Sequence, residues 1–443
     1  MFKVLKENTR LYATWLIMII LISICVATTK LFSVAALLVF SLFVMLSPIN
    51  DSCVLLFGLM PFANIFKYNA GSTSFFTICE LLVVLLAVLK YRKTKSNFMV
   101  SMMIFLAYMI ATSFDNFSVL IIIKVLLGFY LIYLSGCYAK KSDVINISYL
   151  ISASTIITML LSTNKQYFTY IEPYLLDLNY VVDSSGQTSN IMRLSGFLCD
   201  PNYCSVLVIM SLSLLCVLYY YGKIRSEFWI FSAFLIPLGF LTYSKSYFIC
   251  ISALVIFIIL FILFPKHKGL AFLSILGIAA VITMALSGRI EVLNVILGRF
   301  SSGDITTGRT ALNEFYLTYI WNNPDVMFFG EGIAADRIVN AGNNVHNIYI
   351  EGLFKLGLVG CIIYIFTLLK SFPVRKKGAE KRGIVNFFPL SFLAILYCAL
   401  AGISMYELPF YLSIAFLAKD FNLLDENVSI QEKLERNKSD EKI

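Results

Sequence analysis

The sequence has little charge for its length. Asp, Glu, Lys and Arg make up 14% of the 443 residues, whereas hydrophobic residues make up 59%. A soluble core cannot absorb that much apolar surface, so the composition excludes a soluble protein and indicates a polytopic membrane protein. The apolar runs are unbroken over about 16–20 residues, as membrane-spanning helices require and as the alternating strands of a barrel do not. We therefore predict an all-α integral membrane protein.

Histidine is nearly missing, and cysteine shows no metal or redox spacing. The chain has two His and ten Cys, and no C-x-x-C occurs. Most of the cysteines lie in or beside apolar runs, where Cys behaves as a small hydrophobe. We expect no disulfide framework, no metal site and no cofactor. The net charge of +9 does not call for a nucleic-acid partner, because excess Lys and Arg in membrane proteins usually retain loops in the cytoplasm.

Apolar runs between residues 11 and 419 predict fourteen spans, two of them short, so we expect about 12–14 transmembrane helices. The first run, 11–29, is interpreted as a transmembrane helix and not as a cleaved signal peptide. With fourteen spans, every basic cluster falls on the side of the N-terminus. The positive-inside rule then predicts cytoplasmic N- and C-termini.

Two long connections are predicted outside the cytoplasm. The second is expected to be a large helical loop, because residues 310–322 have the aromatic-rich amphipathic pattern of a helix at the membrane interface. The predicted organisation is N-terminal transmembrane helices (1–162), an extracytoplasmic loop (163–202), central transmembrane helices (203–286), a large extracytoplasmic loop (287–345), C-terminal transmembrane helices (346–419) and a cytoplasmic tail (420–443).

Two local patterns at the predicted outer surface carry candidate chemistry. In RLSGFLCDPN (193–202), Arg193 precedes a predicted helix start at Asp200, with a capping acid and then a proline in the first turn. The alternative is a helix cap and an interface arginine without further function. In LTYSKSYF (241–248), a short outer turn places Lys245 outside, against the positive-inside trend. A lone solvated lysine is the alternative there.

Two further patterns lie in and after the large loop. Arg309 stands ahead of the amphipathic segment, and turn-forming Pro324, Gly330 and Gly332 follow it. Then comes NNVHNIYIEG (343–352), with His346 at the entrance of an apolar run. A helix cap or an interface residue is the alternative for this histidine.

Asn347, Glu351 and Lys355 are spaced i, i+4, i+8 and share one helix face. Glu351 is interpreted either as a substrate-binding residue or as the partner of Lys355 in an intrahelical ion pair. Gly352, Gly357 and Gly360 are expected to let neighbouring helices approach closely.

Two charges fall inside predicted spans. At a rise of about 1.5 Å per residue, Glu80 and Lys124 both lie roughly 8–9 Å below the outer surface. Charges inside the membrane are costly and tend to pair. We therefore predict that these two interact, and that swapping both charges restores folding lost in the single reversals.

Arginines, one lysine and one histidine at an outer membrane surface suit a phosphate-bearing substrate. The planar fork of arginine binds phosphate bidentately, and lysine adds a point charge. Histidine titrates near neutrality and can take a proton from a hydroxyl. The residues imply group transfer from a lipid-borne phosphate or diphosphate to a hydroxyl. A metal is poorly supported, because there is one outer histidine and no D-x-D cluster.

Together these patterns resemble the O-antigen polymerase and O-antigen ligase superfamily of bacterial membrane glycosyltransferases. The matching residues are Arg193, Ser195, Gly196, Asp200, Pro201 and Asn202 in the first pattern, Gly308, Arg309, Pro324, Gly330 and Gly332 in the large loop, and His346, Asn347, Gly357 and Gly360 in the last. The motifs cover roughly residues 190–365, and the order and common sidedness of the motifs carry the resemblance. One departure is Lys245, where relatives commonly have arginine, which removes a bidentate fork.

The resemblance implies a GT-C-like fold and a metal-independent, inverting transfer from an undecaprenyl diphosphate-linked glycan. Arg193 and Arg309 would stabilise the departing diphosphate, and His346 would orient or deprotonate the acceptor hydroxyl. Candidate substrate-binding residues are Lys245, Asn347, Asp200, Asn202, Arg289, Arg299 and Glu351.

The expected partners are the lipid-linked oligosaccharide, membrane lipids and a chain-length regulator protein, in the bacterial cytoplasmic (inner) membrane. Polymerisation of repeat units into O-antigen or capsule is favoured. The acceptor stays open, because a ligase would use the lipid A core and a related oligosaccharyltransferase a protein side chain. A lipid-linked oligosaccharide flippase suits the spans but leaves the outer arginines and histidine without a role, and so does a structural scaffold.

Overall fold

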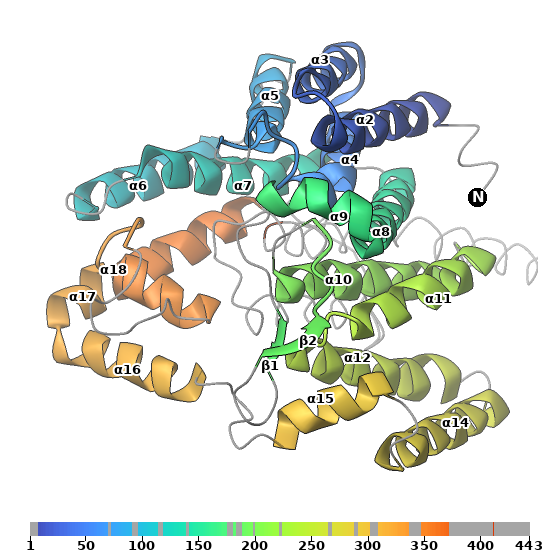
Figure 1. Ribbon diagram of the computed structural model, residues 1–443. Helices are drawn as coiled ribbons and strands as arrows, with labels where there is room; N and C mark the ends of the chain where they lie inside the picture. The colour runs from blue at the N-terminus through green and yellow to red at the C-terminus, as the bar shows by residue number, and fades with distance from the viewer. Residues whose placement is uncertain are drawn as a thin grey trace, which may run out of the picture.

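The computed structural model describes residues 8–69, 72–90, 96–113, 118–138, 141–174, 180–182, 188–197, 200–220, 224–264, 268–287, 291–301, 309–335, 347–371 and 411. Over these ranges the chain is helical apart from one short hairpin and the connecting turns (Figure 1). The predicted all-α class is confirmed.

The first half of the chain folds into helices at the apolar runs, because a backbone in lipid must satisfy its polar groups internally. Each of these helices begins and ends within a few residues of an apolar run. They are α2 (Thr9–Ala27), α3 (Leu31–Leu46), α4 (Ile49–Leu59) with the 3-10 turn Met60–Phe62, α5 (Phe75–Lys90), α6 (Ser96–Thr112), α7 (Val119–Tyr138) and α8 (Lys141–Thr163).

The second half adds a strand pair that the sequence did not indicate. β1 (Tyr180–Val182) pairs antiparallel with β2 (Thr188–Met192), and Tyr180 lies opposite Met192. The helices are α9 (Lys165–Ile171) with the 3-10 turn Glu172–Tyr174, α10 (Pro201–Tyr220), α11 (Ser226–Phe240), α12 (Lys245–Phe257) continued by the π-helical turn Ile258–Leu263, α14 (Lys268–Leu286), α15 (Glu291–Ser301), α16 (Arg309–Asn322), α17 (Pro324–Phe329) and α18 (Ile348–Ser371).

Four of the described helices are long and apolar enough to cross a membrane: Thr9–Ala27, Ser142–Thr163, Pro201–Tyr219 and Ile348–Ser371. Shorter apolar helices pack between them. The protein is therefore a multi-pass membrane protein. Of the two last predicted spans, 384–402 and 408–419, only Tyr411 belongs to the described residues.

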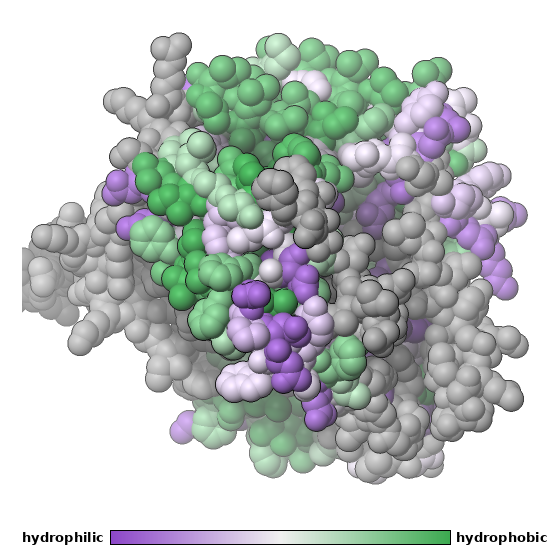
Figure 2. All heavy atoms as spheres, turned by 90° about the vertical axis from the view of Figure 1, so that its left-hand side faces the viewer, coloured by the Kyte–Doolittle hydropathy of each residue, from purple (hydrophilic) through white to green (hydrophobic). Residues whose placement is uncertain are grey.

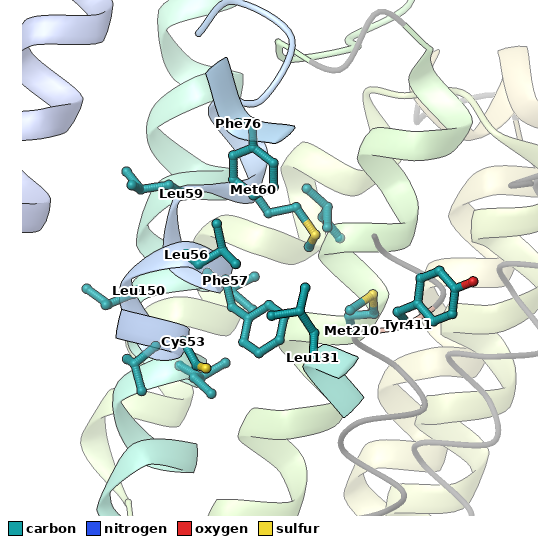
Figure 3. Packing of buried hydrophobic residues seen from close by; sticks show 14 of the residues in the cluster. Cys53, Leu56, Phe57, Leu59, Met60, Phe76, Leu131, Leu150, Met210 and Tyr411 are labelled. Atoms are coloured by element: carbon teal, nitrogen blue, oxygen red, sulfur yellow. The ribbon is translucent and has the colours of Figure 1, made fainter. Parts of the chain in front are cut away.

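The centre of the bundle is a tight apolar core around α4, α7, α8 and α10 (Figure 3). Phe57 of α4 is buried there with Leu131 and Leu150. Small residues allow the close approach, since a Cβ at Gly58 would lie 2.7 Å from the Cβ of Leu150. Ser154 donates a hydrogen bond of 2.6 Å to the Gly58 carbonyl, which ties α8 to α4.

The helix ends gather at two opposite ends of the bundle. At one end, Arg10 and Lys90 donate to carbonyls of Leu46 and Met45 at the end of α3. At the other end, Ser74 before α5 donates to the Ala63 carbonyl after α4, and the ring of Phe197 packs against Phe62. The segment before α10 therefore lies at the same end as the turn between α4 and α5.

The apolar outer surface fits a lipid environment. Leu38, Leu42 and Leu89 are among the large side chains that point outward. Figure 2, which views the side on which α6 and α17 lie, shows broad apolar areas and a group of hydrophilic side chains near the middle of that face. Glu80 is buried on α5, and Lys124 on α7 is near enough for an electrostatic interaction with it, as the sequence predicts.

Candidate functional site

Arg193 directly follows β2 and is held in a fixed position. Its side chain is largely buried, with 9% of the residue exposed. The Nε donates to the Thr242 carbonyl at 3.0 Å, and Nη2 donates to Oδ1 of Asn202 at 3.3 Å. The backbone N–H of Leu194 adds a 2.9 Å bond to the Leu241 carbonyl. The segment between β2 and α10 is therefore fastened to the turn between α11 and α12.

Asn202 connects three segments through one oxygen. Its Oδ1 accepts from Arg193 and also from the Ser244 hydroxyl at 2.9 Å. Ser244 in turn accepts from the N–H of Tyr247 and so caps α12. The sequence predicts Asn202 as a substrate-binding residue, and the structure shows it orienting Arg193.

The predicted helix start at Asp200 is confirmed. α10 begins at Pro201, and Oδ1 of Asp200 accepts the N–H of Asn202 at 2.6 Å. Just before it, Gly196 has a φ of 55°, a conformation that favours glycine. A Cβ at Gly196 would also lie 3.2 Å from Sγ of Cys204, so the packing on α10 is tight here as well.

The predicted short turn at 241–244 is present, and it contacts the large loop. Lys245 is the first residue of α12 and is half-buried beside this turn. Tyr243 adopts a φ of 49°, which is rare for a residue with a side chain. Tyr243 and Ile296 of α15 form a small buried cluster. The large loop therefore begins against the turn that carries Lys245 (Figure 1).

Arg309 is the first residue of α16, in the second part of the large loop. The predicted helix over 310–322 is present as α16. Helices α16 and α17 pack on α18 and not on α10 to α12 (Figure 1). Tyr316 and Phe354 meet edge to face with ring centroids 5.1 Å apart, at the centre of this contact.

α18 is broken at Gly357, which has φ 64° and ψ −178°. A break in a membrane helix releases backbone carbonyls that need new donors. The N–H groups of Glu331 and Gly332, after α17, donate to the carbonyls of Phe354 and Lys355 at 2.8 and 3.1 Å. The hydroxyl of Tyr108 on α6 lies 2.6 Å from the third carbonyl, that of Leu356.

Glycines make this contact possible. A Cβ at Gly330 would lie 2.4 Å from the Lys355 carbonyl oxygen, and one at Gly357 would lie 2.5 Å from the backbone of Phe328 and Phe329. The prediction that Gly357 and Gly360 let neighbours approach closely is confirmed. The loop glycines and the helix glycines, far apart in the sequence, meet at one place.

The start of α18 is built from the predicted helix face. Oδ1 of Asn347 accepts from the N–H groups of Tyr349 and Ile350, so Asn347 is the N-cap. Glu351 and Lys355 form a buried ion pair with an N–O distance of 2.9 Å. Of the two interpretations of Glu351, the structure shows the intrahelical ion pair.

Several predicted residues lie outside the described part. These are His346, Arg289 and Gly308, and the side chain of Arg299 on α15 is also not described. Tyr108 and Ser113 belong to the site region but were missed, because nothing in their local sequence distinguishes them. In the described ranges, no three His, Cys, Asp or Glu side chains gather so as to hold a metal ion.

Comparison with known proteins gives one match. Residues 230–365 match the sequence model of the family described as O-Antigen ligase. The matched range runs from α11 to α18, so it includes the Lys245 turn, Arg309 and the break at Gly357, but not Arg193. No curated protein and no solved structure matches the chain.

Proposed function

We propose, from the match of residues 230–365 to the O-antigen ligase family, that the protein polymerises undecaprenyl diphosphate-linked repeat units into a surface polysaccharide such as O-antigen or capsule. The reaction is an inverting glycosyl transfer that needs no metal. It takes place on the outer face of the cytoplasmic (inner) membrane, with both termini of the chain in the cytoplasm.

The observation that carries the proposal is the fixed arginine beside the Lys245 turn. Arg193 is buried, and its guanidinium donates to the Thr242 carbonyl and to Oδ1 of Asn202. These two bonds fix the direction of the guanidinium group, whose planar fork is suited to binding a phosphate. Lys245 begins the helix that the same turn caps. Two positive groups from different loops thus stand at one end of the bundle, which suits the diphosphate of a lipid-anchored donor.

In the proposed reaction, the acceptor hydroxyl oxygen attacks the anomeric carbon of the donor sugar. A new C–O bond forms on the face opposite the diphosphate, and the old bond between the anomeric carbon and the diphosphate oxygen breaks. His346 takes the hydroxyl proton, and the undecaprenyl diphosphate leaves with the bonding electrons. Arg193, Arg309 and Lys245 neutralise the charge that develops on it. Asp200 and Asn202 hold the first loop in place. The surrounding site also includes Arg289, Arg299 and Asn347.

The deciding experiment uses purified protein and a lipid-linked repeat unit in the presence of EDTA. Chain extension visible as a ladder of products supports a polymerase. Transfer that requires added lipid A core indicates a ligase, and movement of the substrate across liposomes without extension indicates a flippase.

His346→Ala and Arg309→Ala are expected to abolish the ladder while the protein still inserts into membranes. Normal product lengths in both variants refute the enzymatic assignment. In cells, a chain-length regulator would act on this product distribution.

A further inference from the structure

Tyr108, near the end of α6, stands at the break of α18. Its hydroxyl lies 2.6 Å from the Leu356 carbonyl and 3.0 Å from the Phe329 carbonyl at the end of α17. Its ring packs on Gly360, after the break, where a Cβ would lie 2.4 Å from Cε1, so the glycine makes room for the ring. One tyrosine side chain therefore contacts both halves of α18 and the end of α17.

α6 holds the same region by a second bond. The N–H of Ile333 donates to the Ser113 hydroxyl at 3.0 Å, and both residues are buried. In the half of α18 after the break, the Thr367 hydroxyl donates to the Ser101 carbonyl of α6 at 3.2 Å, which ties this half to α6 as well. α6 is thus the common support for the loop after α17 and for both halves of α18.

The half of α18 before the break is an arm that ends at the site. It runs from Ile348 to Leu356, and Asn347 caps it. His346 is joined to this cap by one peptide bond. At about 1.5 Å per residue, the nine steps from Asn347 to Leu356 make an arm of about 13 Å. A rotation of about 5° at the break would move its end by about 1 Å, a displacement that can cost about 100-fold in rate.

We propose that Tyr108 is a positioning residue for glycosyl transfer: its hydroxyl fixes the angle of the Gly357 break and thereby the position of Asn347 at the N-cap of α18. This role rests on the proposed function. Tyr108 is half-buried and acts through Leu356 and Phe329, so it aligns the reacting groups without being one of them.

The test compares Tyr108→Phe with Tyr12→Phe. The control removes a similar hydroxyl, which donates to Oδ1 of Asn146 at 2.9 Å near the start of α2. Loss of the Tyr108 hydroxyl is expected to lower kcat about tenfold and to change KM for the lipid-linked donor by less than about twofold. Amide hydrogen exchange over residues 329–334 and 354–361 should become faster. Tyr12→Phe should keep the kcat of the wild type, and both variants should melt at the same temperature.

A Tyr108→Phe protein with kcat within about twofold of the wild type overturns the positioning role. A loss of kcat that is matched by an equal loss of folded protein overturns it as well, in favour of a purely structural bond. Failure of the proposed function has a different signature. In that case the wild type transfers no glycan, although exchange at residues 329–334 still rises in Tyr108→Phe.

Discussion

Replacing Gly357 with alanine tests the central contact between α17 and α18. Gly357 combines φ 64° with ψ −178°, a region open almost only to glycine, and adopting it costs other residues about 1–3 kcal/mol. The new Cβ would also lie 2.5 Å from the backbone of Phe328 and Phe329, which cannot move as a flexible side chain would. Overpacking of this kind adds about 1–3 kcal/mol. Together Gly357→Ala should lower the free energy of unfolding by about 2–6 kcal/mol.

The assay is unfolding of purified protein in detergent, followed by circular dichroism, with Gly277→Ala as the matched control. Gly277 lies in α14, and a Cβ there would meet nothing within 4 Å. Alanine at a helical position of this kind is neutral or stabilising by up to about 1 kcal/mol. If Gly357→Ala unfolds at the same point as Gly277→Ala, the close approach of the two backbones is wrong. A Gly330→Ala variant should be destabilised like Gly357→Ala, because a Cβ at Gly330 would collide with the Lys355 carbonyl oxygen in the same contact between α17 and α18.

Three further predictions concern single side chains. Asn202→Ala removes the acceptor shared by Arg193 and Ser244, and it should cost about 1–3 kcal/mol of stability together with most transferase activity. Asn202→Asp keeps the oxygen and should retain more of both the stability and the activity. Equal losses in the two variants would contradict this prediction. Lys355→Met removes the ion-pair partner of the buried Glu351 carboxylate and should lower the free energy of unfolding by about 3–5 kcal/mol. The double variant Glu351→Leu with Lys355→Met should recover most of that loss in the same unfolding assay. The hydrogen bond to Glu331 and burial raise the pKa of Tyr319 from 10.0 to about 12, so the folded state holds this proton more tightly than the unfolded state. The resulting stability is present below pH 10 and is lost as the pH rises through about 12. A Tyr319→Phe variant should lack this pH-dependent loss of stability when unfolding is measured over a series of pH values.

Local features of the sequence were sufficient for the helices and their ends. Apolar runs of membrane-spanning length have one backbone solution in lipid, so α2 to α8 and α10 to α14 lie close to where the runs predict them. Asp200 and Pro201 start α10 because a cap and a first-turn proline act within a few residues of each other. The ion pair of Glu351 with Lys355 is equally local, since i and i+4 are neighbours on any helix.

The hairpin β1–β2 shows where local reasoning fails. Its strands are three and five residues long, in a loop with no alternating pattern strong enough to predict them. Nothing near Arg193 indicates that its partner is the carbonyl of Thr242, 49 residues away. Backbone carbonyls look alike in every sequence, so only the packed structure selects one of them.

Sequence alone determined that this is a mainly helical multi-pass membrane protein, where most of its apolar helices start and stop, and that Glu351 can pair with Lys355 one helical turn away. These properties follow from hydrophobicity, helix capping and the cost of charge in lipid, which act residue by residue or over a few turns. The tertiary structure decided that Gly330 meets Gly357, that Asn202 orients Arg193, and that Tyr108 joins α6 to both halves of a broken helix. Such contacts depend on how whole helices pack, and that geometry is a property of the complete fold.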